Sequence, residues 1–168
     1  MTVFDAIQAR KSIRKYKADA VSEADLRKVL EAGVLSPSAK NMQMYKFLVI
    51  TDAERNKKMR KACGGQNMIG QAPVSIVMLS KSERMMPIGL EAGIIDTSIA
   101  LSFMMLQATE LGLATCWLGN VDAPKLKEIL EIPEEYTIVA VTPLGYADEE
   151  GIKRTRKPFE ELVSFNEL

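Results

Sequence analysis

The sequence predicts an α+β fold in which helices flank a mixed central β-sheet. Hydrophobic patterns typical of helices and of strands alternate along the whole chain, which places both kinds of element in one structure. The stretch "VSIVMLS" at 74–80 is a near-continuous apolar run, as expected of a strand that is buried on both faces. Because 168 residues is an ordinary length for one domain, we expect a single domain over residues 1–168.

Two helices are expected before the first strand. Residues 2–9 suit a short helix with its apolar side chains on one side. The sequence "SEAD" at 22–25 resembles a capping box, in which the first and fourth residues satisfy the free N–H groups at a helix start. Apolar residues then recur at helical spacing until Pro37, which disfavours helical geometry at Ser36 and so ends the helix.

The middle of the chain is expected to hold two strands separated by a basic helix. "KFLVIT" at 46–51 reads as a strand, and the run at 74–80 reads as a second. Asp52 is placed to cap a helix over 53–62, whose many cations suit a solvated helix face.

The most apolar element is a long helix predicted from Gly89 to Leu111 and ended by Gly112. It is apolar nearly all round, so it must be covered on most sides, either by its own sheet or by a second subunit. Glu91 and Asp96 within this stretch argue against a membrane span. Three further elements follow, a strand at 114–118, a short helix at 124–130 and a strand at 136–146.

Charge is concentrated locally although the chain as a whole is neutral. Lys plus Arg and Asp plus Glu both number 22, which lacks the basic excess typical of nucleic-acid-binding proteins. Two compact basic clusters nevertheless stand out, "RKSIRKYK" at 10–17 and "KRTRKP" at 153–158, here called the N-terminal and C-terminal basic clusters. Guanidinium groups suit phosphate geometry, so one coherent hypothesis is that both clusters bind the same small phosphate group. A solvated basic face is the alternative interpretation of the first cluster.

Two uncharged stretches are further candidates for a binding site. The loop "SPSAKNMQ" at 36–43 is small and polar yet lies between two apolar elements, although a plain turn would have a similar sequence. In "LGLATCWLGN" at 111–120, Gly119 lies between a strand and a helix, where a glycine lets a ligand approach the backbone, or simply makes a turn.

The rare residue types limit the chemistry. Histidine is absent, which excludes Ser-His-Asp and Cys-His catalysis, and no Asp/Glu or Cys pattern indicates a metal site. Cys63 and Cys116 form no disulfide framework, from which we infer a reducing cytoplasm. An enzyme of this composition would need a cofactor to carry the reactive atom.

Together the four stretches resemble the short form of the nitroreductase family of FMN-dependent oxidoreductases. The matching sequences are "RKSIRKY", "SPSAKNMQ", "LGLATCWLG" after the long apolar helix, and "PLGY" with "RTRKPFEELV". Their order and spacing match over essentially the whole chain. The resemblance implies a nitroreductase-like fold and an intertwined homodimer whose FMN sites lie at the subunit interface.

The resemblance also implies which residues hold FMN. The phosphate and ribityl chain would be held by Arg10, Lys11, Ser12, Arg154 and Arg156. The cation of Arg14 would lie near the pyrimidine edge of the flavin ring. The loop from the other subunit would contribute Pro37, Ser38, Ala39, Asn41 and Gln43. The strand end that faces the ring, where a backbone N–H commonly points at flavin N5, would contribute Cys116, Leu118 and Gly119.

Three features depart from the family pattern. Met44 and Tyr45 follow the loop where Pro and Trp are frequent, and Tyr45 can still pack as an aromatic residue. A lysine that longer relatives carry near the flavin has no counterpart, and Gln66 or Asn67 are the alternatives here. The segment "KSERMMPIG" is short, which leaves little material for a lid, and its methionines suit packing rather than chemistry.

The implied activity is a ping-pong reaction. NADPH or NADH would deliver hydride to flavin N5, and a small electron acceptor such as a nitroaromatic or a quinone would then take the electrons. The implied partners are these small molecules, with no nucleic acid and no membrane, and no side chain is assigned as a proton donor. Two other classes stay open, a non-catalytic FMN-binding protein (a sensor or reservoir) and a nucleic-acid-associated protein that uses the clusters at 10–17, 55–61 and 153–157.

Overall fold

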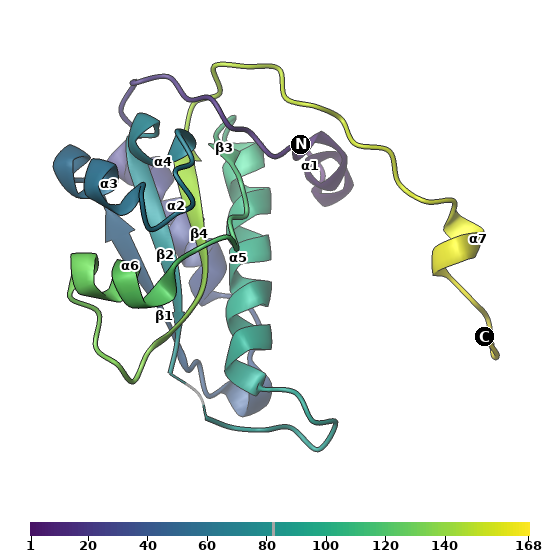
Figure 1. Cartoon of the computed structure of the whole chain (residues 1–168). Helices are drawn as coiled ribbons and strands as arrows, with labels where there is room; N and C mark the ends of the chain where they lie inside the picture. The colour runs from purple at the N-terminus through teal and green to yellow at the C-terminus, as the bar shows by residue number, and fades with distance from the viewer. Residues whose placement is uncertain (82) are drawn as a thin grey trace.

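The computed structural model describes residues 1–81 and 83–168, whose helices and strands are shown in Figure 1. In chain order the elements are α1 (Val3–Ala9), α2 (Glu23–Val34), the 3-10 turn η1 (Ala39–Asn41), β1 (Tyr45–Ile50), α3 (Ala53–Met59), α4 (Met68–Gln71), β2 (Val74–Ser80), α5 (Ala92–Glu110), β3 (Ala114–Thr115), α6 (Ala123–Leu130), β4 (Thr137–Gly145) and α7 (Phe159–Leu162). The predicted α+β fold is confirmed.

The centre of the molecule is a four-stranded sheet with the strand order β1-β2-β4-β3. All three pairings between these strands are antiparallel. Within the described part of the chain, the one parallel pairing is a bridge between Ser12 and Thr115, which adds a short piece of the N-terminal segment beyond β3. The mixed character of the sheet is therefore confined to the edge where the N-terminal basic cluster begins.

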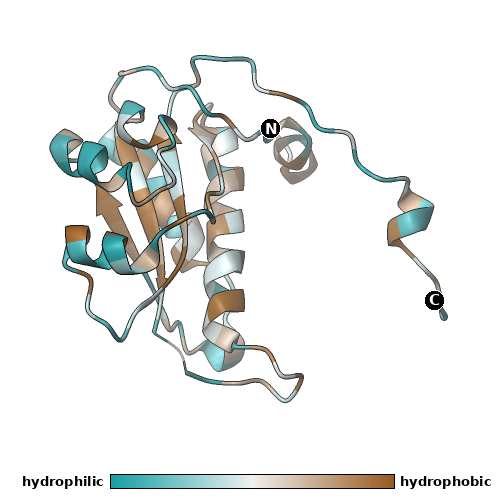
Figure 2. Cartoon of the chain, in the orientation of Figure 1, coloured by the Kyte–Doolittle hydropathy of each residue, from teal (hydrophilic) through white to brown (hydrophobic). Residues whose placement is uncertain are grey.

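Helices cover both faces of the sheet. The side chains of a strand alternate between the two faces, and apolar side chains on each face must be covered. One buried cluster includes Val29 of α2, Ile76 and Met78 of β2, and Leu101 and Met104 of α5. The other includes Met59 of α3, Ile69 of α4, Val77 and Leu79 of β2, and Leu126 of α6. β2 is buried along its whole length, as the apolar run at 74–80 predicted. Figure 2 shows this concentration of apolar residues in the strands and α5.

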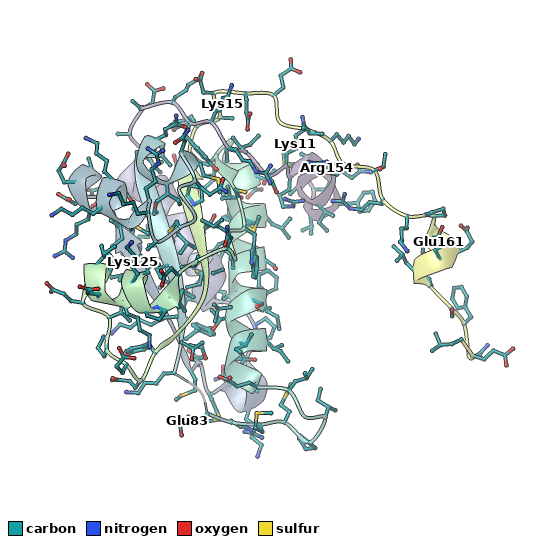
Figure 3. All side chains as sticks on the ribbon, in the orientation of Figure 1. Lys11, Lys15, Glu83, Lys125, Arg154 and Glu161 are labelled. Atoms are coloured by element: carbon teal, nitrogen blue, oxygen red, sulfur yellow. The ribbon has the colours of Figure 1, made fainter. Side chains whose placement is uncertain are left out.

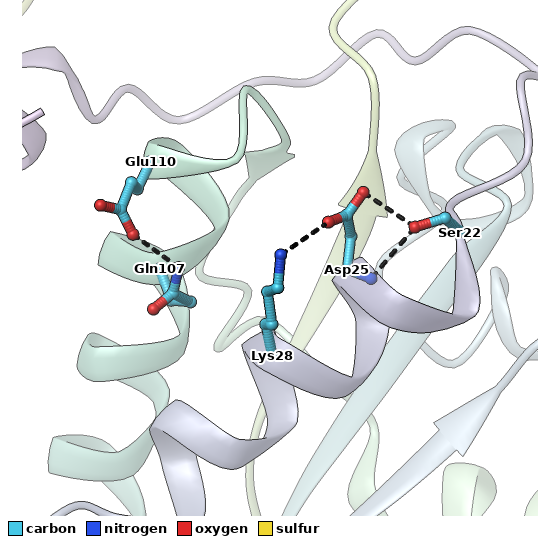
Figure 4. A network of polar contacts seen from close by, with 5 residues as sticks. All are labelled: Ser22, Asp25, Lys28, Gln107 and Glu110. Carbon is cyan, nitrogen blue, oxygen red and sulfur yellow. Dashed lines mark hydrogen bonds and ion pairs between the residues drawn. The ribbon is translucent and has the colours of Figure 1, made fainter.

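Side-chain caps fix where several helices begin. Ser22 accepts a hydrogen bond from the Asp25 backbone N–H, and its hydroxyl donates to the Asp25 carboxylate, which Figure 4 shows beside Lys28. The predicted "SEAD" sequence thus caps α2, although a complete capping box is found at Thr2 and Asp5 in α1. Asp52 caps α3 as expected.

The long helix begins at Ala92 rather than at the predicted Gly89. Gly89 has φ +80° and lies in a turn in which the Met86 N–H donates to the Leu90 carbonyl, so the helix cannot start there. It ends as predicted before Gly112, whose φ is +72°. By length and composition α5 could cross a membrane, yet half of its apolar window is buried inside the protein, as for a core helix.

Other boundaries also differ from the expected ones. The helix expected over 53–62 ends at Met59, and the strand expected over 114–118 is reduced to Ala114–Thr115. Beyond Thr115 the chain leaves the regular ladder, and Leu118 returns to pair with Val141 in an isolated bridge. The short elements η1, α4 and α7 were not predicted.

The C-terminal segment leaves the body of the molecule. Residues 152–168 are exposed throughout, and Figure 1 shows α7 standing apart from the sheet and its helices. Large apolar side chains are nevertheless present there, with Phe159 62% exposed and Phe165 76% exposed. Nothing in the described chain covers them.

Candidate functional site

The structure brings the two basic clusters together in one cleft of about 480 Å³. The described residues that line it include six cations and no carboxylate. The cations are Arg10, Lys11, Arg14, Lys153, Arg154 and Arg156. Figure 3 labels Lys11 and Arg154, which lie at the same upper end of the molecule although they are far apart in sequence. The shared location supports one anion-binding site, and its ligand stays a prediction.

Backbone pairing holds the N-terminal basic cluster in place from both sides. On one side, the Ile13 N–H donates to the Thr115 carbonyl of β3 at 3.0 Å. On the other, the Lys17 N–H donates to the Tyr146 carbonyl at 3.0 Å, directly after β4. Residues 11–17 therefore run between the sheet edge and the segment that leads to the C-terminal basic cluster.

A turn at 149–151 joins the two clusters. The Glu149 carboxylate accepts a hydrogen bond from the Arg14 backbone N–H, and Lys11 Nζ donates to the Glu150 carbonyl at 3.0 Å. Gly151 has φ +68°, and a Cβ there would lie 2.5 Å from Cδ1 of Ile13. Only glycine fits this position without strain, because it tolerates a positive φ and leaves room for the Ile13 side chain.

The cations of the cleft are not neutralised within the chain. Among the described residues, none of the four arginines of the cleft forms an ion pair with a carboxylate. Arg156 instead donates to the carbonyls of Arg154 and Thr155, at 3.1 and 3.3 Å. Unpaired cations gathered in one concave site produce a positive potential, which attracts an anion.

A second cavity of about 450 Å³ shares Arg10 and Ser12 with the cleft. Its other lining residues are less polar and come from α5 and from the segment after β3. They are Ser102, Met105, Leu106 and Trp117. Arg10 and Ser12 thus stand between a strongly cationic space and a largely apolar one.

Of the predicted strand-end residues, none is among those that line the two cavities, although Trp117 between them lines the second. Cys116 and Leu118 are buried, and Gly119 is exposed with open space where a Cβ would be. Burial raises the pKa of the Cys116 thiol, whereas the charges of Arg14 and Arg10 and a hydrogen bond from Ser12 act in the opposite direction. The thiol is therefore protonated at neutral pH, which does not suit a nucleophile.

The loop at 36–43 lies elsewhere, against the N-terminal part of α5. The Ala39 backbone N–H donates to both carboxylate oxygens of Asp96, each at 3.1 Å. Asp96 and Met105, which lines the second cavity, are two and a half helical turns apart. This separation corresponds to about 14 Å of helix axis and to opposite sides of α5. Within one chain the loop and the cleft are therefore not brought together.

The loop is held in an unusual backbone conformation. Lys40, Asn41 and Gln43 have φ of 52°, 55° and 51°, the left-handed region that non-glycine residues rarely adopt. Each such residue costs on the order of 1 kcal/mol. Hydrogen bonds compensate: Ser38 Oγ accepts from the Gln43 backbone N–H at 3.1 Å, and Gln43 Nε2 donates to Asn41 Oδ1 at 3.1 Å. The remaining predicted loop residue, Pro37, is exposed.

Several residues around the site were not predicted. Lys153, Gln8 and Ile152 also line the cleft, and of these only Lys153 lay in a stretch singled out for its charge. Glu149 and Asp96, which hold the turn and the loop, gave no sequence signal of that role. Neither Gln66 nor Asn67 is among the residues that line the two cavities, although their turn lies near Asn120, whose Nδ2 would be 2.7 Å from a Cβ at Gly64.

Comparison with known proteins identifies the family. A family model described as "Nitroreductase family" matches residues 7–68 and 61–146, which together span most of the chain. The chain belongs to the nitroreductase family. The matched residues include the N-terminal basic cluster, the loop and the strand end, and they stop before the C-terminal basic cluster.

Individual relatives extend the similarity to the full length. The FMN reductase [NAD(P)H] of Bacillus subtilis is 31% identical, over 98% of this chain and 73% of that protein. A nitroreductase family protein of Clostridium difficile has a TM-score of 0.90 at 30% identity, over 100% of both chains. An FMN-dependent nitroreductase from Clostridium difficile R20291 has a TM-score of 0.84 at 31% identity, over 98% of this chain and 99% of that chain.

Proposed function

We propose that this protein is an FMN-dependent NAD(P)H oxidoreductase in which residues 1–168 form a single FMN-binding domain. The observation that carries the proposal is the cleft in which both basic clusters meet. The proposal is supported by relatives that are named FMN reductase and FMN-dependent nitroreductase. We further propose a homodimer, located in the cytoplasm, that passes electrons to a nitroaromatic, a quinone or a similar small acceptor.

The cavities fit the two ends of FMN. Its terminal phosphate carries nearly two negative charges at neutral pH and matches the unpaired guanidinium groups of Arg10, Arg154 and Arg156. Its flat ring matches the less polar cavity beside Arg10 and Ser12, where Trp117 and Met105 provide apolar surface. A phosphate monoester also explains why FMN fits better than FAD, whose phosphates carry one charge each.

The protein's own residues would position the cofactor and stabilise charge. When bound, FMN would supply a site that takes hydride from NADH or NADPH and returns electrons to the acceptor. Arg14 would place a cation near the pyrimidine edge, where negative charge develops on reduction. Nothing lies within 4 Å of a Cβ placed at Gly119, so a ring could approach the backbone at this position. No side chain is assigned as a proton donor.

Exposed apolar surface supports the homodimer. Val3 of α1, Leu35 after α2 and Phe103 of α5 are 73%, 83% and 41% exposed and lie around a third cavity of about 340 Å³. The C-terminal segment also exposes large apolar side chains, and exposed apolar surface of this kind is typical of interaction sites. A two-fold arrangement would also allow the loop of one chain to reach the cleft of the other.

The free thiols support the cytoplasmic location. Cys63 and Cys116 are both unpaired and buried. Unpaired cysteines in a small protein are typical of a reducing compartment.

Release of the cofactor tests the proposal. We expect the purified protein to be yellow, and chromatography of the supernatant after denaturation to yield FMN. Rapid bleaching by NADH or NADPH, followed by recovery with a quinone, would separate an oxidoreductase from a flavin reservoir. Release of FAD alone, or failure of the flavin-free protein to take up added FMN, would refute it.

A further inference from the structure

Asp96 is a buried carboxylate that the proposed flavin site does not account for. It is 5% exposed and lies one turn into α5, away from both basic clusters. Among the described residues its hydrogen-bond partner is the Ala39 backbone N–H, and no cation forms an ion pair with it. Burying a carboxylate without a counter-charge is unfavourable, so its presence calls for a role beyond packing.

The contact that Asp96 makes lies at the start of the strained part of the loop. Ala39 is followed directly by Lys40 and Asn41, both with positive φ. The hydrogen bonds of Ser38 and Gln43 close the loop internally, whereas the Ala39–Asp96 bond is the polar contact that ties it to the rigid helix α5. Without that contact, the loop could relax toward ordinary backbone angles.

We propose that Asp96 is a positioning residue, which fixes the loop at 36–43 in the conformation that presents Ser38 and Asn41 to the flavin bound in the partner's cleft. This inference rests on the proposed function. The required property is the acceptor oxygen rather than the charge, because a single N–H is the group to be held. The residue acts through the loop and does not itself touch the cofactor.

Three variants separate this role from general stability. Asp96→Leu keeps a similar side-chain size but removes the acceptor, Asp96→Asn keeps one carbonyl oxygen for the Ala39 N–H, and Thr97→Val is the matched control. Thr97 is buried beside Asp96, and its hydroxyl donates only within α5, to the Gly93 carbonyl at 2.7 Å. Its loss should lower stability without moving the loop.

The first measurement is FMN affinity by fluorescence titration, with the visible circular dichroism of the bound flavin. We expect Asp96→Leu to weaken FMN binding about tenfold, because the loop would no longer be held where it contacts the flavin, and to change the flavin dichroism. The FMN affinity of Asp96→Asn should stay within about threefold of that of the unmodified protein, and the FMN affinity of Thr97→Val within about twofold. Equal weakening by Asp96→Asn, or by Thr97→Val, would overturn the proposal, as would an Asp96→Leu protein with unchanged affinity and dichroism.

The second measurement needs no flavin. Amide hydrogen exchange in the flavin-free protein should be faster over residues 36–43 in Asp96→Leu than in Thr97→Val, and unchanged exchange there would overturn the proposal. If the unmodified protein takes up no FMN, the proposed function has failed, and the exchange result still decides whether Asp96 holds the loop. The two failures are therefore distinguishable.

Discussion

The basic cleft and the loop at 36–43 are built in opposite ways. The cleft gathers cations that form no ion pair among the described residues, and the Arg156 side chain donates hydrogen bonds to the carbonyls of Arg154 and Thr155. The loop contributes no unpaired charge to the cleft but holds three non-glycine residues at positive φ through hydrogen bonds to Ser38 and to the buried Asp96. One region concentrates charge, and the other fixes backbone geometry.

The difference follows from how the two kinds of interaction depend on distance. Coulomb attraction falls off gradually, so flexible arginines can bind a phosphate without being fixed beforehand. A hydrogen bond weakens steeply with misalignment, so a segment that is to contact a rigid ring must be held in place in advance. We therefore expect the cleft to determine affinity and the loop to determine orientation.

The largest effect should come from combining a damaged cleft with a damaged loop in different chains. One inactive parent carries Arg10→Ala with Arg156→Ala, and the other carries Ser38→Trp. If each site takes its cleft from one chain and its loop from the other, both lesions fall in one site of a mixed dimer. Co-refolding should then restore about a quarter of the unmodified activity under random two-fold pairing.

The controls for this experiment are each parent refolded alone, which should stay inactive. Isolated mixed dimers that bind no FMN would contradict the shared site. A protein that is monomeric at micromolar concentration while retaining its flavin would do so as well.

The next effect concerns the cleft alone. Losing a charge-assisted hydrogen bond costs about 1.5–3 kcal/mol, so Arg10→Ala with Arg156→Ala should weaken FMN binding roughly a hundredfold or more. Arg55→Ala with Lys58→Ala removes the same charge from the exposed surface of α3 and serves as the control. We expect fluorescence titration to show little change for the control. Equal weakening of FMN binding by the two pairs would mean that net charge, and not the cleft, determines the affinity.

A smaller effect is expected from the turn that joins the two clusters. Gly151→Ala and Gly112→Ala both place alanine at a positive φ, which costs on the order of 1 kcal/mol. Only at Gly151 would the new Cβ also collide with Ile13, since nothing lies within 4 Å of the corresponding position at Gly112.

Both glycine variants should therefore melt at lower temperature, and only Gly151→Ala should also weaken FMN binding severalfold. Thermal denaturation and flavin titration on the two proteins check this. The same FMN affinity for both would mean that the turn does not position Arg154 and Arg156.

The last comparison is between the two buried thiols, and it tests whether the charge of the cleft reaches into the core. Burial raises the pKa of Cys63 from 9.0 to about 11, so the folded state keeps a proton that the unfolded state releases. Stability from this thiol is complete below pH 9 and is lost as pH rises toward 11, by up to about 1.4 kcal/mol per pH unit. Cys63→Ala should flatten the decline in denaturant-measured stability across this window.

Cys116→Ala should flatten the same decline less. Its thiol is also raised in pKa by burial, but the cations of Arg14 and Arg10 oppose the rise. An equal flattening in both variants would indicate that the cleft cations have no influence on the buried thiol.

The sequence predicted most reliably those elements whose signal is local. The strand at 74–80 was predicted with its observed bounds, because burial on both faces leaves an unbroken apolar run. The strand predicted at 114–118 was too long, because the ladder with β4 stops at Thr115 and only Leu118 pairs with β4 again, in an isolated bridge, although Cys116 is buried as well. Hydrophobicity alone does not distinguish a buried residue that pairs in the sheet from one that does not.

The candidate site was predictable in its charges and not in its supports. Arg10 and Arg156 were recognisable because each lies in a cluster of cations, and clustered like charges in a neutral chain indicate an anion-binding site. Nothing in "SPSAKNMQ" indicated positive φ at Lys40 or Gln43, since neither residue type favours it. Asp96 was read only as an argument against a membrane span, because its partner Ala39 is distant in sequence and offers only a backbone N–H.

The backbone pairing of the N-terminal basic cluster has a consequence for protein engineering. The path of residues 11–17 is set by main-chain hydrogen bonds, from the Ile13 N–H to Thr115 and from the Lys17 N–H to Tyr146. Exposed side chains on such a segment can be exchanged without altering the route of the chain. This stretch is therefore suited to engineering at its exposed positions Arg14, Lys15 and Lys17, where substitutions would change the charge beside the cleft on an unchanged scaffold.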